Sequence, residues 1–306
     1  MTDYILKYPV YNIDNTFLLQ TGSELTEDLM KNIRLSGSRK NFKSAKIMEF
    51  GTIKKDVMDF MTHEPYDVIF SDRKQTDSVI DSMNSINIII PVLESLEYFK
   101  NADFYTYRHM LLVFALSILL SKELIKYHID LTEGAMASPA HDFGKICIPL
   151  NILTKSNALT ITEKKIIEHH ALAGYVLLQY YMHDSNKLVS YIARDHHEKR
   201  NGTGYPLGIR LEDPIVEIVA VCDIYDALIS PRPYRPVSYD NRSAIEEVII
   251  KAEKGEFSWN VVNALISCNR KAKPHHNQIE VSKEKRGKSP AGNNYGLFDE
   301  GIKNKN

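Results

Sequence analysis

Residues 162–182 read TEKKIIEHHALAGYVLLQYYM, and their apolar side chains recur at spacings of three and four. That period places the apolar side chains on one face of a helix. Two adjacent histidines, His169 and His170, lie in the middle of the stretch. The stretch therefore predicts a long core helix that also carries side chains able to bind a metal ion.

The segments on either side of this helix show the same spacing. They are residues 77–99, 104–127, 185–197, 213–230 and 238–255. Prolines fall between several of them, as at Pro149 and Pro206, and mark turns. Residues 77–269 are therefore predicted to form one helical-bundle domain, and the fold class is mainly α.

The first 76 residues have a mixed pattern instead. Residues 4–12 and 15–22 are rich in β-branched and aromatic side chains, which predicts strands, and so does the short apolar run Tyr66–Phe70. Residues 23–33 and 52–63 have helical spacing. Residues 1–76 are therefore expected to form a small α/β domain with a regulatory or dimerising role, although they contain no chemical motif.

Composition narrows the class of protein. The chain has 306 residues, of which 43% are hydrophobic, and its 38 basic and 39 acidic side chains leave a net charge of −1. This balance argues against DNA as a partner. Leu111–Leu120 is the longest apolar candidate and is too short for a membrane span. The first residues do not have the basic start and apolar core expected of a signal peptide, and three scattered cysteines predict a reducing cytoplasm.

The C-terminal stretch, residues 270–306, differs from the bundle. From residue 271 onward it contains eight Lys or Arg against four acids, a charge of +4. Few apolar side chains interrupt it, so it is expected to be a mobile basic tail. It either solubilises the chain or makes a weak nucleotide or partner contact.

Histidine is the most informative residue type in the chain. Eight of the 11 histidines fall between His109 and His197, together with two aspartates in distinctive settings, Asp142 and Asp223. They lie on separate predicted helices, so they can converge only in the core of a bundle, a common place for metal sites. Nitrogen and carboxylate ligands without cysteine suit iron or manganese, and zinc less specifically.

A site of this kind has a defined charge. Two divalent ions carry a charge of +4, the two aspartates contribute −2, and neutral histidines contribute none. The net charge of the site is therefore about +2. A net positive site attracts an anionic phosphodiester. Asp142 could hold one ion on each carboxylate oxygen, and a water held between the ions would become a nucleophile at neutral pH.

Five motifs in order resemble those of the HD-GYP family. They are His109 upstream, HDFGK at 141–145, the His196-His197 pair followed by GTGYP at 202–206, DIYDAL at 223–228, and RPYR at 232–235. The family consists of metal-dependent phosphodiesterases that linearise the bacterial second messenger cyclic di-GMP. The resemblance covers roughly residues 90–265, and the first 76 residues resemble no family that we can name.

The resemblance implies a ligand set and a catalytic pair. The metal ligands would be His109, His141, Asp142, His170, His196, His197 and Asp223. Asp142 would bridge the two ions. His170 is preferred to His169 because it lies four residues before Gly174, as in the family, and Asp226 would orient a ligand. Asp223 could instead cap a helix.

The resemblance also implies a substrate site. Lys145 would meet a substrate phosphate and act in catalysis, although it could be a solvated lysine. Gly204 and Tyr205 would shape the entrance. Arg232 and Arg235 match family positions near the nucleotide, where a guanidinium can fork onto a phosphate, unless they only anchor a loop.

The chain departs from the family pattern around the site. Where some members have a glutamate that holds a third metal, this chain has Tyr105, which favours a two-metal centre. Ala171 replaces a proline, and Asn201 replaces the usual aspartate before Gly-x-Gly-Tyr-Pro. These changes surround the ligands and bear on turnover more than on metal binding.

The expected function is therefore hydrolysis of cyclic di-GMP to linear pGpG, or GMP, by a hydroxide that bridges two ions. Iron is the first choice of metal and manganese the second. The alternative is a catalytically weak signalling module that binds metal. Such a module would also bind either a nucleotide or a partner protein, and the partner would dock on the GYP loop. Hydrolysis of another cyclic dinucleotide and formation of a homodimer both stay open.

Overall fold

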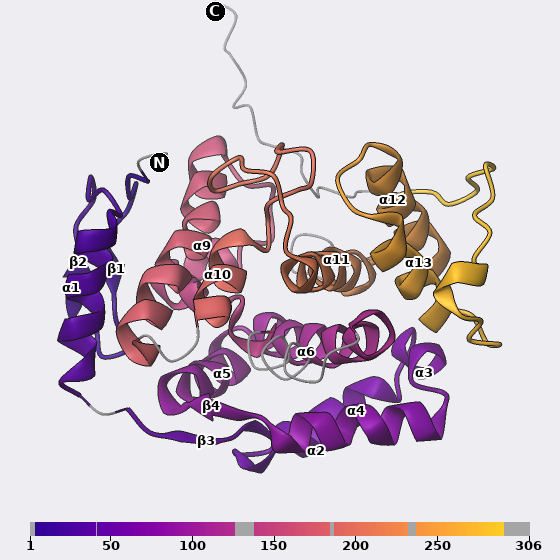
Figure 1. Cartoon of the computed structure of the whole chain (residues 1–306), viewed down its shortest axis with the longest axis horizontal. Helices are drawn as coiled ribbons and strands as arrows, with labels where there is room; N and C mark the ends of the chain where they lie inside the picture. Colours follow the sequence, from indigo (N-terminus) through magenta and orange to yellow (C-terminus); the bar gives the residue numbers. More distant parts are fainter. Residues whose placement is uncertain (1–3, 41, 126–137, 184–186, 232–236, 291–306) are drawn as a thin grey trace, which may run out of the picture.

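The computed structural model describes residues 4–40, 42–125, 138–183, 187–231 and 237–290 (Figure 1). These residues are mainly helical, with two short antiparallel sheets, which confirms the expected fold class. The strands are β1 (Val10–Tyr11), β2 (Phe17–Leu19), β3 (Ser44–Lys46) and β4 (Asn87–Ile89). The α-helices are α1 (Glu27–Ser38), α2 (Ile53–Met61), α3 (Tyr66–Ile69), α4 (Arg73–Ser85), α5 (Ile90–Ala102), α6 (Phe104–Leu124), α8 (Leu150–Leu153), α9 (Ile161–Met182), α10 (Lys187–Asp195), α11 (Pro214–Ile229), α12 (Asn241–Glu253) and α13 (Trp259–Cys268). Four 3₁₀ helices complete them: η1 (Ile47–Glu49), η2 (Ser138–Ala140), η3 (Phe143–Cys147) and η4 (His276–Gln278).

The N-terminal elements follow the sequence pattern with one exception. β1 and β2 lie in the stretches expected to be strands and form an antiparallel hairpin, and the Thr26 side chain caps α1 by accepting from the Leu29 amide at 3.2 Å. Residues Tyr66–Phe70 were expected to be a strand, but Tyr66–Ile69 is one turn of helix, α3. Such a short apolar run fits either structure, and here the turn buries Tyr66 and Ile69, three residues apart, on one side.

The N-terminal region and the bundle share one hydrophobic core, which runs from Leu6 to Cys268. β3 pairs with β4, so that Ser44 lies opposite Ile89, and α4 spans the expected domain boundary at residue 76. α1 packs against α9, and both α2 and α4 pack against α6. The first 76 residues are therefore held against the bundle by a ladder, a helix and common apolar side chains.

Helix α6 lies at the centre of the bundle. It packs against α5 on one side and α11 on the other, while α9 and α10 lie toward the N-terminal sheet and α12 and α13 at the opposite end (Figure 1). By length and composition α6 could cross a membrane, which the sequence pattern did not anticipate. However, 83% of its most apolar 18-residue window is buried inside the protein, as expected for a core helix.

Two glycines let the HDFG segment approach α9. A Cβ on Gly144 would lie 2.0 Å from the His170 carbonyl oxygen and 2.4 Å from the Gly174 amide nitrogen. Gly174 and His170 are one turn apart on the same face of α9, which is also the face that meets η3. The close backbone contact therefore sets the position of His170 relative to His141 and Asp142.

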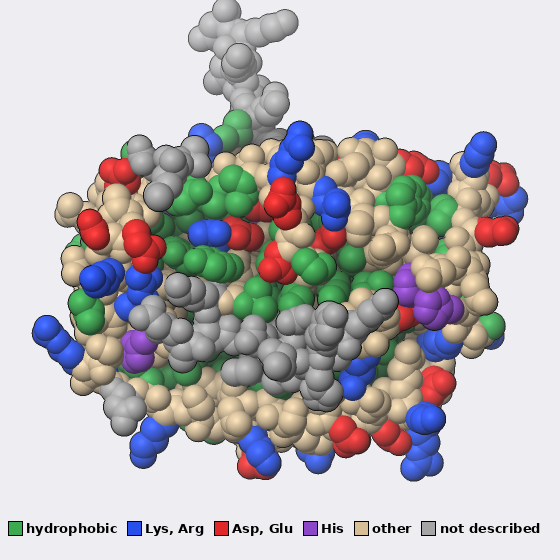
Figure 2. Space-filling model, viewed as in Figure 1, with side chains coloured by type: hydrophobic (Ala, Val, Ile, Leu, Met, Phe, Trp, Pro, Cys, Tyr) green, Lys and Arg blue, Asp and Glu red, His purple; other side chains and the backbone are tan. Residues whose placement is uncertain are grey.

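The described part of the basic tail, up to residue 290, contacts the bundle. The Lys273 ammonium donates to the carbonyl oxygens of Val68 at 2.6 Å and Cys268 at 2.6 Å. The Gly287 amide donates to Glu246 Oε2 at 2.6 Å. Charges of both signs are interspersed over the face seen in Figure 2, so this face carries no large patch of one sign.

Substitution of Gly144 by alanine should destabilise the protein and weaken metal binding. The new Cβ meets backbone atoms, and overpacking of this kind costs about 1–3 kcal/mol. Gly174→Ala is the control and should destabilise the protein less, because its Cβ would lie 3.3 Å from its nearest neighbour. Urea unfolding and metal titration of both variants measure the effects. Equal stabilities for the two variants would contradict this packing.

Candidate metal centre

Seven side chains from separate parts of the chain meet in the bundle core. His109 comes from α6, the pair His141 and Asp142 lies between η2 and η3, and His170 comes from α9. His196 and His197 directly follow α10, and Asp223 lies in the middle of α11. Six of the seven are buried, and the His197 side chain is 20% exposed. The structure thus brings together every residue of the expected ligand set.

Asp142 lies at the centre of this group. Its Oδ1 is 3.4 Å from His170 Nε2 and 4.0 Å from His196 Nε2. Its Oδ2 is 3.5 Å from His109 Nε2 and 3.4 Å from His141 Nε2. The two carboxylate oxygens therefore face two different sets of histidines, which is the arrangement that a bridging ligand requires.

Backbone carbonyl groups fix the orientation of three histidine rings. The Nδ1 atoms of His141 and His170 each lie 2.6 Å from a carbonyl oxygen, of Ser138 and Ile167 respectively. His196 Nδ1 is 3.0 Å from the Ala193 carbonyl oxygen. A carbonyl oxygen only accepts, so each Nδ1 is assigned the proton. The Nε2 lone pairs then point into the site, as in histidines that ligate metal.

These lone pairs fit a bound cation. His170 Nε2 is 3.3 Å from His196 Nε2, so two unprotonated nitrogens face each other, and it is 3.2 Å from His197 Nε2. His141 Nε2 is buried and, within the described chain, has no hydrogen-bond partner. Such groups are costly without a partner, and a metal ion between them would satisfy each lone pair. Groups of three residues whose ligand atoms lie within 4.8 Å of one another include His170, His196 and His197, and His109, His141 and Asp223.

The protonation states suit ligation. Burial raises the pKa of Asp142, but Lys145, His141 and His170 together outweigh it and hold the pKa well below its usual range. Burial, helped by neighbouring positive groups, lowers the pKa of His196 to about 3 and shifts that of His170 in the same direction. The carboxylate is therefore charged and these imidazoles are neutral at physiological pH, which are the forms that bind metal.

His109 is held by a second set of contacts, of which the sequence anticipated only Asp226. Its Nδ1 donates to Asp226 Oδ2 at 2.6 Å, which fits the orienting role expected for Asp226. The buried Tyr66 hydroxyl donates to the other oxygen of Asp226, and the Arg108 guanidinium lies 5.2 Å over the Tyr66 ring. Tyr66 is 160 residues from Asp226, so no local pattern could have identified it.

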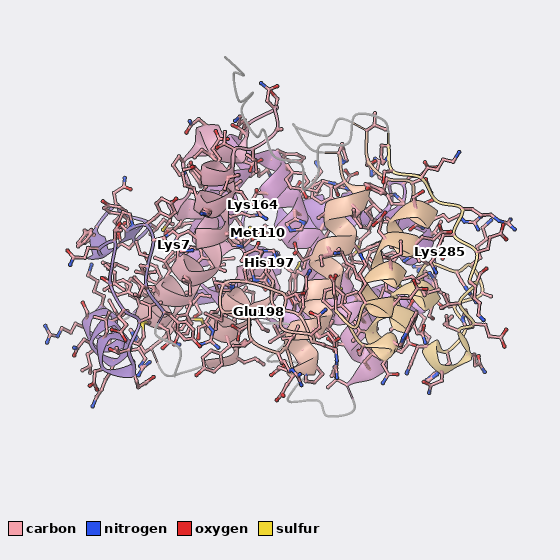
Figure 3. The ribbon with its side chains drawn as sticks, turned by 90° about the horizontal axis from the view of Figure 1, so that it is seen from above. Lys7, Met110, Lys164, His197, Glu198 and Lys285 are labelled. Atoms are coloured by element: carbon pink, nitrogen blue, oxygen red, sulfur yellow. The ribbon has the colours of Figure 1, made fainter. Side chains whose placement is uncertain are left out.

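The GYP loop closes over the exposed edge of the site. The Tyr205 ring stacks on the His197 ring with centroids 4.5 Å apart. The Glu198 carboxylate accepts from the Leu207 amide at 2.6 Å, and a Cβ on Gly204 would lie 2.4 Å from the Glu198 Cα. His197 and Glu198 lie near the middle of the molecule in Figure 3. Glu198 thus anchors the loop, a role that the sequence analysis did not assign.

The remaining expected site residues differ in placement. Lys145 Nζ is 2.5 Å from Asp142 Oδ2 and only 13% exposed, so it is not a solvated lysine. His169 faces away from the centre, with Nε2 3.4 Å from the Pro9 carbonyl oxygen. Arg232 and Arg235 lie outside the described residues, and nothing in the structure bears on them.

A further group of possible metal ligands lies apart from this centre. His276 Nδ1 is 2.8 Å from Glu123 Oε1, and His275 lies beside His276. Neither histidine belongs to a motif of the sequence, and both were expected to be surface residues. The Glu123 contact ties the tail to the end of α6 and is sufficient to account for the cluster.

Comparisons with known proteins identify the family of this chain. The family model of the HD domain matches residues 98–257, slightly more than half of the chain. The chain therefore belongs to the HD domain family. Its motifs and its relatives make it a member of the HD-GYP group within that family.

Several curated relatives are enzymes of cyclic-dinucleotide metabolism. A cyclic di-GMP phosphodiesterase of Pseudomonas aeruginosa is 34% identical over 201 residues, which are 64% of this chain and 47% of the relative. One from Thermotoga maritima is 35% identical over 187 residues, 60% of this chain and 49% of the relative. The 3'3'-cGAMP-specific phosphodiesterase 1 of Vibrio cholerae is 29% identical over 169 residues, 54% of this chain and 35% of the relative. The chain thus spans about half the length of the first two relatives, or less.

Among solved structures, the chain is similar to an HDG"Y"P protein from Bdellovibrio bacteriovorus. The TM-score is 0.44 and the sequence identity 18%, over 85% of this chain and 93% of the other.

Replacement of Tyr66 by phenylalanine should weaken metal binding by about tenfold. The change removes the hydrogen bond that holds Asp226 against His109, and loss of such outer contacts typically costs 10–100-fold in metal affinity. Tyr107→Phe is the matched control, because the Tyr107 hydroxyl donates to Asp56 at 2.6 Å, away from the centre. Competition titration with a metal indicator measures both. Equal metal affinities of the two variants would show that the Tyr66 hydroxyl does not support the metal centre through Asp226.

The metal-free protein should lose stability as the pH falls below about 6.5. Burial lowers the pKa of His169 to about 4 and that of His196 to about 3, from 6.5 in an unfolded chain. Over that interval the unfolded chain binds protons that the folded protein does not. Each such histidine lowers the free energy of unfolding by about 1.4 kcal/mol for every unit by which the pH falls in this interval. The pKa of His109 is raised in the folded protein, so protonation of this one histidine stabilises the folded state and partly offsets the loss.

Urea unfolding of chelator-treated protein at pH 7.5, 6.5 and 5.5 measures this dependence. The free energy of unfolding should change little between the first two values and fall at the third. A free energy that stays level or rises down to pH 5.5 would contradict the burial of these imidazoles.

Proposed function

We propose that this chain is a metal-dependent phosphodiesterase that hydrolyses cyclic di-GMP to linear pGpG, or to GMP, in the cytoplasm. The observation that carries the proposal is Asp142, whose two oxygens face separate sets of inward-pointing histidine nitrogens. The relatives named as cyclic di-GMP phosphodiesterases support the choice of substrate. Because the chain spans about half of their length, the activity is proposed from the site itself.

The ligand set suits two divalent ions, iron first and manganese second, because it contains nitrogen and carboxylate donors without cysteine. When bound, such ions supply Lewis acidity and acidify a water so that it can attack at neutral pH. Asp142 would hold both ions, with His170, His196 and His197 around Oδ1 and His109, His141 and Asp223 around Oδ2.

The chain's own residues prepare the site for an anionic substrate. The two aspartates return −2 against +4 from the ions, which leaves about +2, and the Lys145 ammonium adds a further positive charge beside Asp142. Lys145 would donate to a phosphoryl oxygen and neutralise charge that develops there. Gly204, Tyr205 and, outside the described residues, Arg232 and Arg235 would contact the nucleotide.

The alternative is a catalytically weak module that binds metal and nucleotide. It rests on the departures near the site, such as Tyr105, whose ring stacks on the His109 ring 5.7 Å away where some members carry a carboxylate. In that case a partner protein would dock on the GYP loop, and a homodimer would be compatible with either function.

Substitution of Asp142 by alanine should remove metal and activity together. Elemental analysis of anaerobically purified protein, coupled to a cyclic di-GMP hydrolysis assay on the same sample, should find about two ions per unaltered chain and formation of pGpG. The variant should hold less than one ion, and its rate should fall at least about a hundredfold, since even outer-shell changes cost 10–100-fold.

Asp77→Ala is the control, because Asp77 is exposed and pairs only with Arg73 on α4 within the described chain. It should keep both ions and the full rate. Two ions without product in the unaltered chain would favour the weak module, and an Asp142→Ala variant that keeps both ions would disprove the bridging role.

A further inference from the structure

A cavity of about 380 Å³ lies beside the metal centre. The N-terminal segment contributes Tyr4 and Lys7 to its wall, α9 contributes Lys165 and Glu168, and the GYP loop contributes Tyr205. This volume falls within the range of small-molecule sites and is sufficient for one nucleotide. Tyr4 and Lys7 lie outside residues 98–257, so the HD domain match does not include this part of the wall.

Tyr205 joins the cavity to the metal centre. Its ring lines the cavity and stacks on His197, the most exposed of the seven expected ligands. His169 also lines the cavity but faces away from the metal centre, so the connection between the two is made by Tyr205. A molecule with one phosphodiester at the metal centre could therefore extend past Tyr205 into this cavity.

The cavity wall has charges that suit a nucleotide phosphate. Within the part of the chain that the structure describes, neither Lys7 nor Lys165 has an ion-pair partner, and both are exposed at the cavity mouth. Lys7 lies on the side of α9 that faces the N-terminal strands, away from the tail that carries Lys285 (Figure 3). Tyr4 and Tyr205 add aromatic surface on which a base can stack.

Glu168 gives the cavity a means to select the base. Its side chain is 28% exposed, and its Oε1 is 3.4 Å from Lys164 Nζ. An ionised carboxylate only accepts hydrogen bonds. The Watson–Crick edge of guanine presents two adjacent donors, N1–H and the N2 amino group, whereas adenine presents an acceptor at N1. A carboxylate therefore pairs with guanine and repels the same edge of adenine.

We propose that this cavity binds the second guanosine monophosphate unit of a cyclic dinucleotide, with Lys7 and Lys165 at its phosphate and Glu168 at the guanine edge. The inference rests on the proposed phosphodiesterase function and extends it to base specificity. It also gives the N-terminal segment a direct part in substrate recognition.

The test compares Glu168→Gln with the unaltered, metal-loaded full chain on three substrates: cyclic di-GMP, cyclic di-AMP and bis(p-nitrophenyl) phosphate. Glutamine keeps the shape of the side chain but loses its charge. The preference in kcat/KM for cyclic di-GMP over cyclic di-AMP should fall about tenfold or more through KM, because hydrogen bonds to charged groups are the stronger ones. Hydrolysis of bis(p-nitrophenyl) phosphate, which has no base, should not change.

Lys7→Met should raise KM for both dinucleotides alike, by roughly threefold, as expected for an exposed charge. Glu212→Gln and Lys31→Met are the matched controls, because both residues are exposed and neither lines the cavity. An unchanged base preference in Glu168→Gln would overturn the inference, and so would an equal loss on bis(p-nitrophenyl) phosphate.

Failure of the proposed function has a different signature. If the unaltered chain hydrolyses none of the three substrates, calorimetric binding of cyclic di-GMP and cyclic di-AMP replaces the kinetic readout. A guanine preference that Glu168→Gln abolishes would then support the cavity without the phosphodiesterase, and absence of dinucleotide binding would overturn both.

Discussion

The buried carboxylate of Asp142 is the constraint on which the rest of the structure depends. A charge in a protein core is costly unless other groups compensate for it, and here the compensation comes from Lys145 and from whatever cation the surrounding histidines hold. Those histidines come from α6, the segment between η2 and η3, α9 and the segment after α10. The helices must therefore pack in one arrangement to bring their Nε2 atoms around the two oxygens.

The packing of backbone against backbone sets this arrangement. Gly144 brings the HDFG segment into contact with the turn of α9 that carries His170, and carbonyl oxygens of three segments orient the rings. Because the rings are held from behind, the site is largely preorganised for metal, and little ordering remains to be done when an ion binds. The same contacts explain why glycine, rather than any larger residue, stands beside the ligands.

The N-terminal region takes part in the site rather than lying apart from it. Tyr66 reaches His109 through Asp226, and Tyr4 and Lys7 form one wall of the cavity beside Tyr205. β3 and β4 join the region to the bundle across the expected boundary at residue 76. A displacement of the N-terminal region would therefore change both the contacts of His109 and the shape of the cavity beside Tyr205.

The sequence by itself predicted most of the helices and the candidate ligands that the structure brings together, although it did not predict β4, which interrupts the expected helical stretch 77–99. Helical periodicity is local, and the metal-binding residue types occur in short motifs whose local register, as with His170 and Gly174, selects one histidine of a pair. Only the tertiary structure decided that Tyr66–Ile69 is helical, that Tyr66 supports Asp226, and that Glu198 anchors the GYP loop. It also decided that the N-terminal segment meets α9 and Tyr205 in a cavity. Most of these contacts join residues far apart in the chain, and none belongs to a repeating or local pattern, so they follow only from how the elements pack.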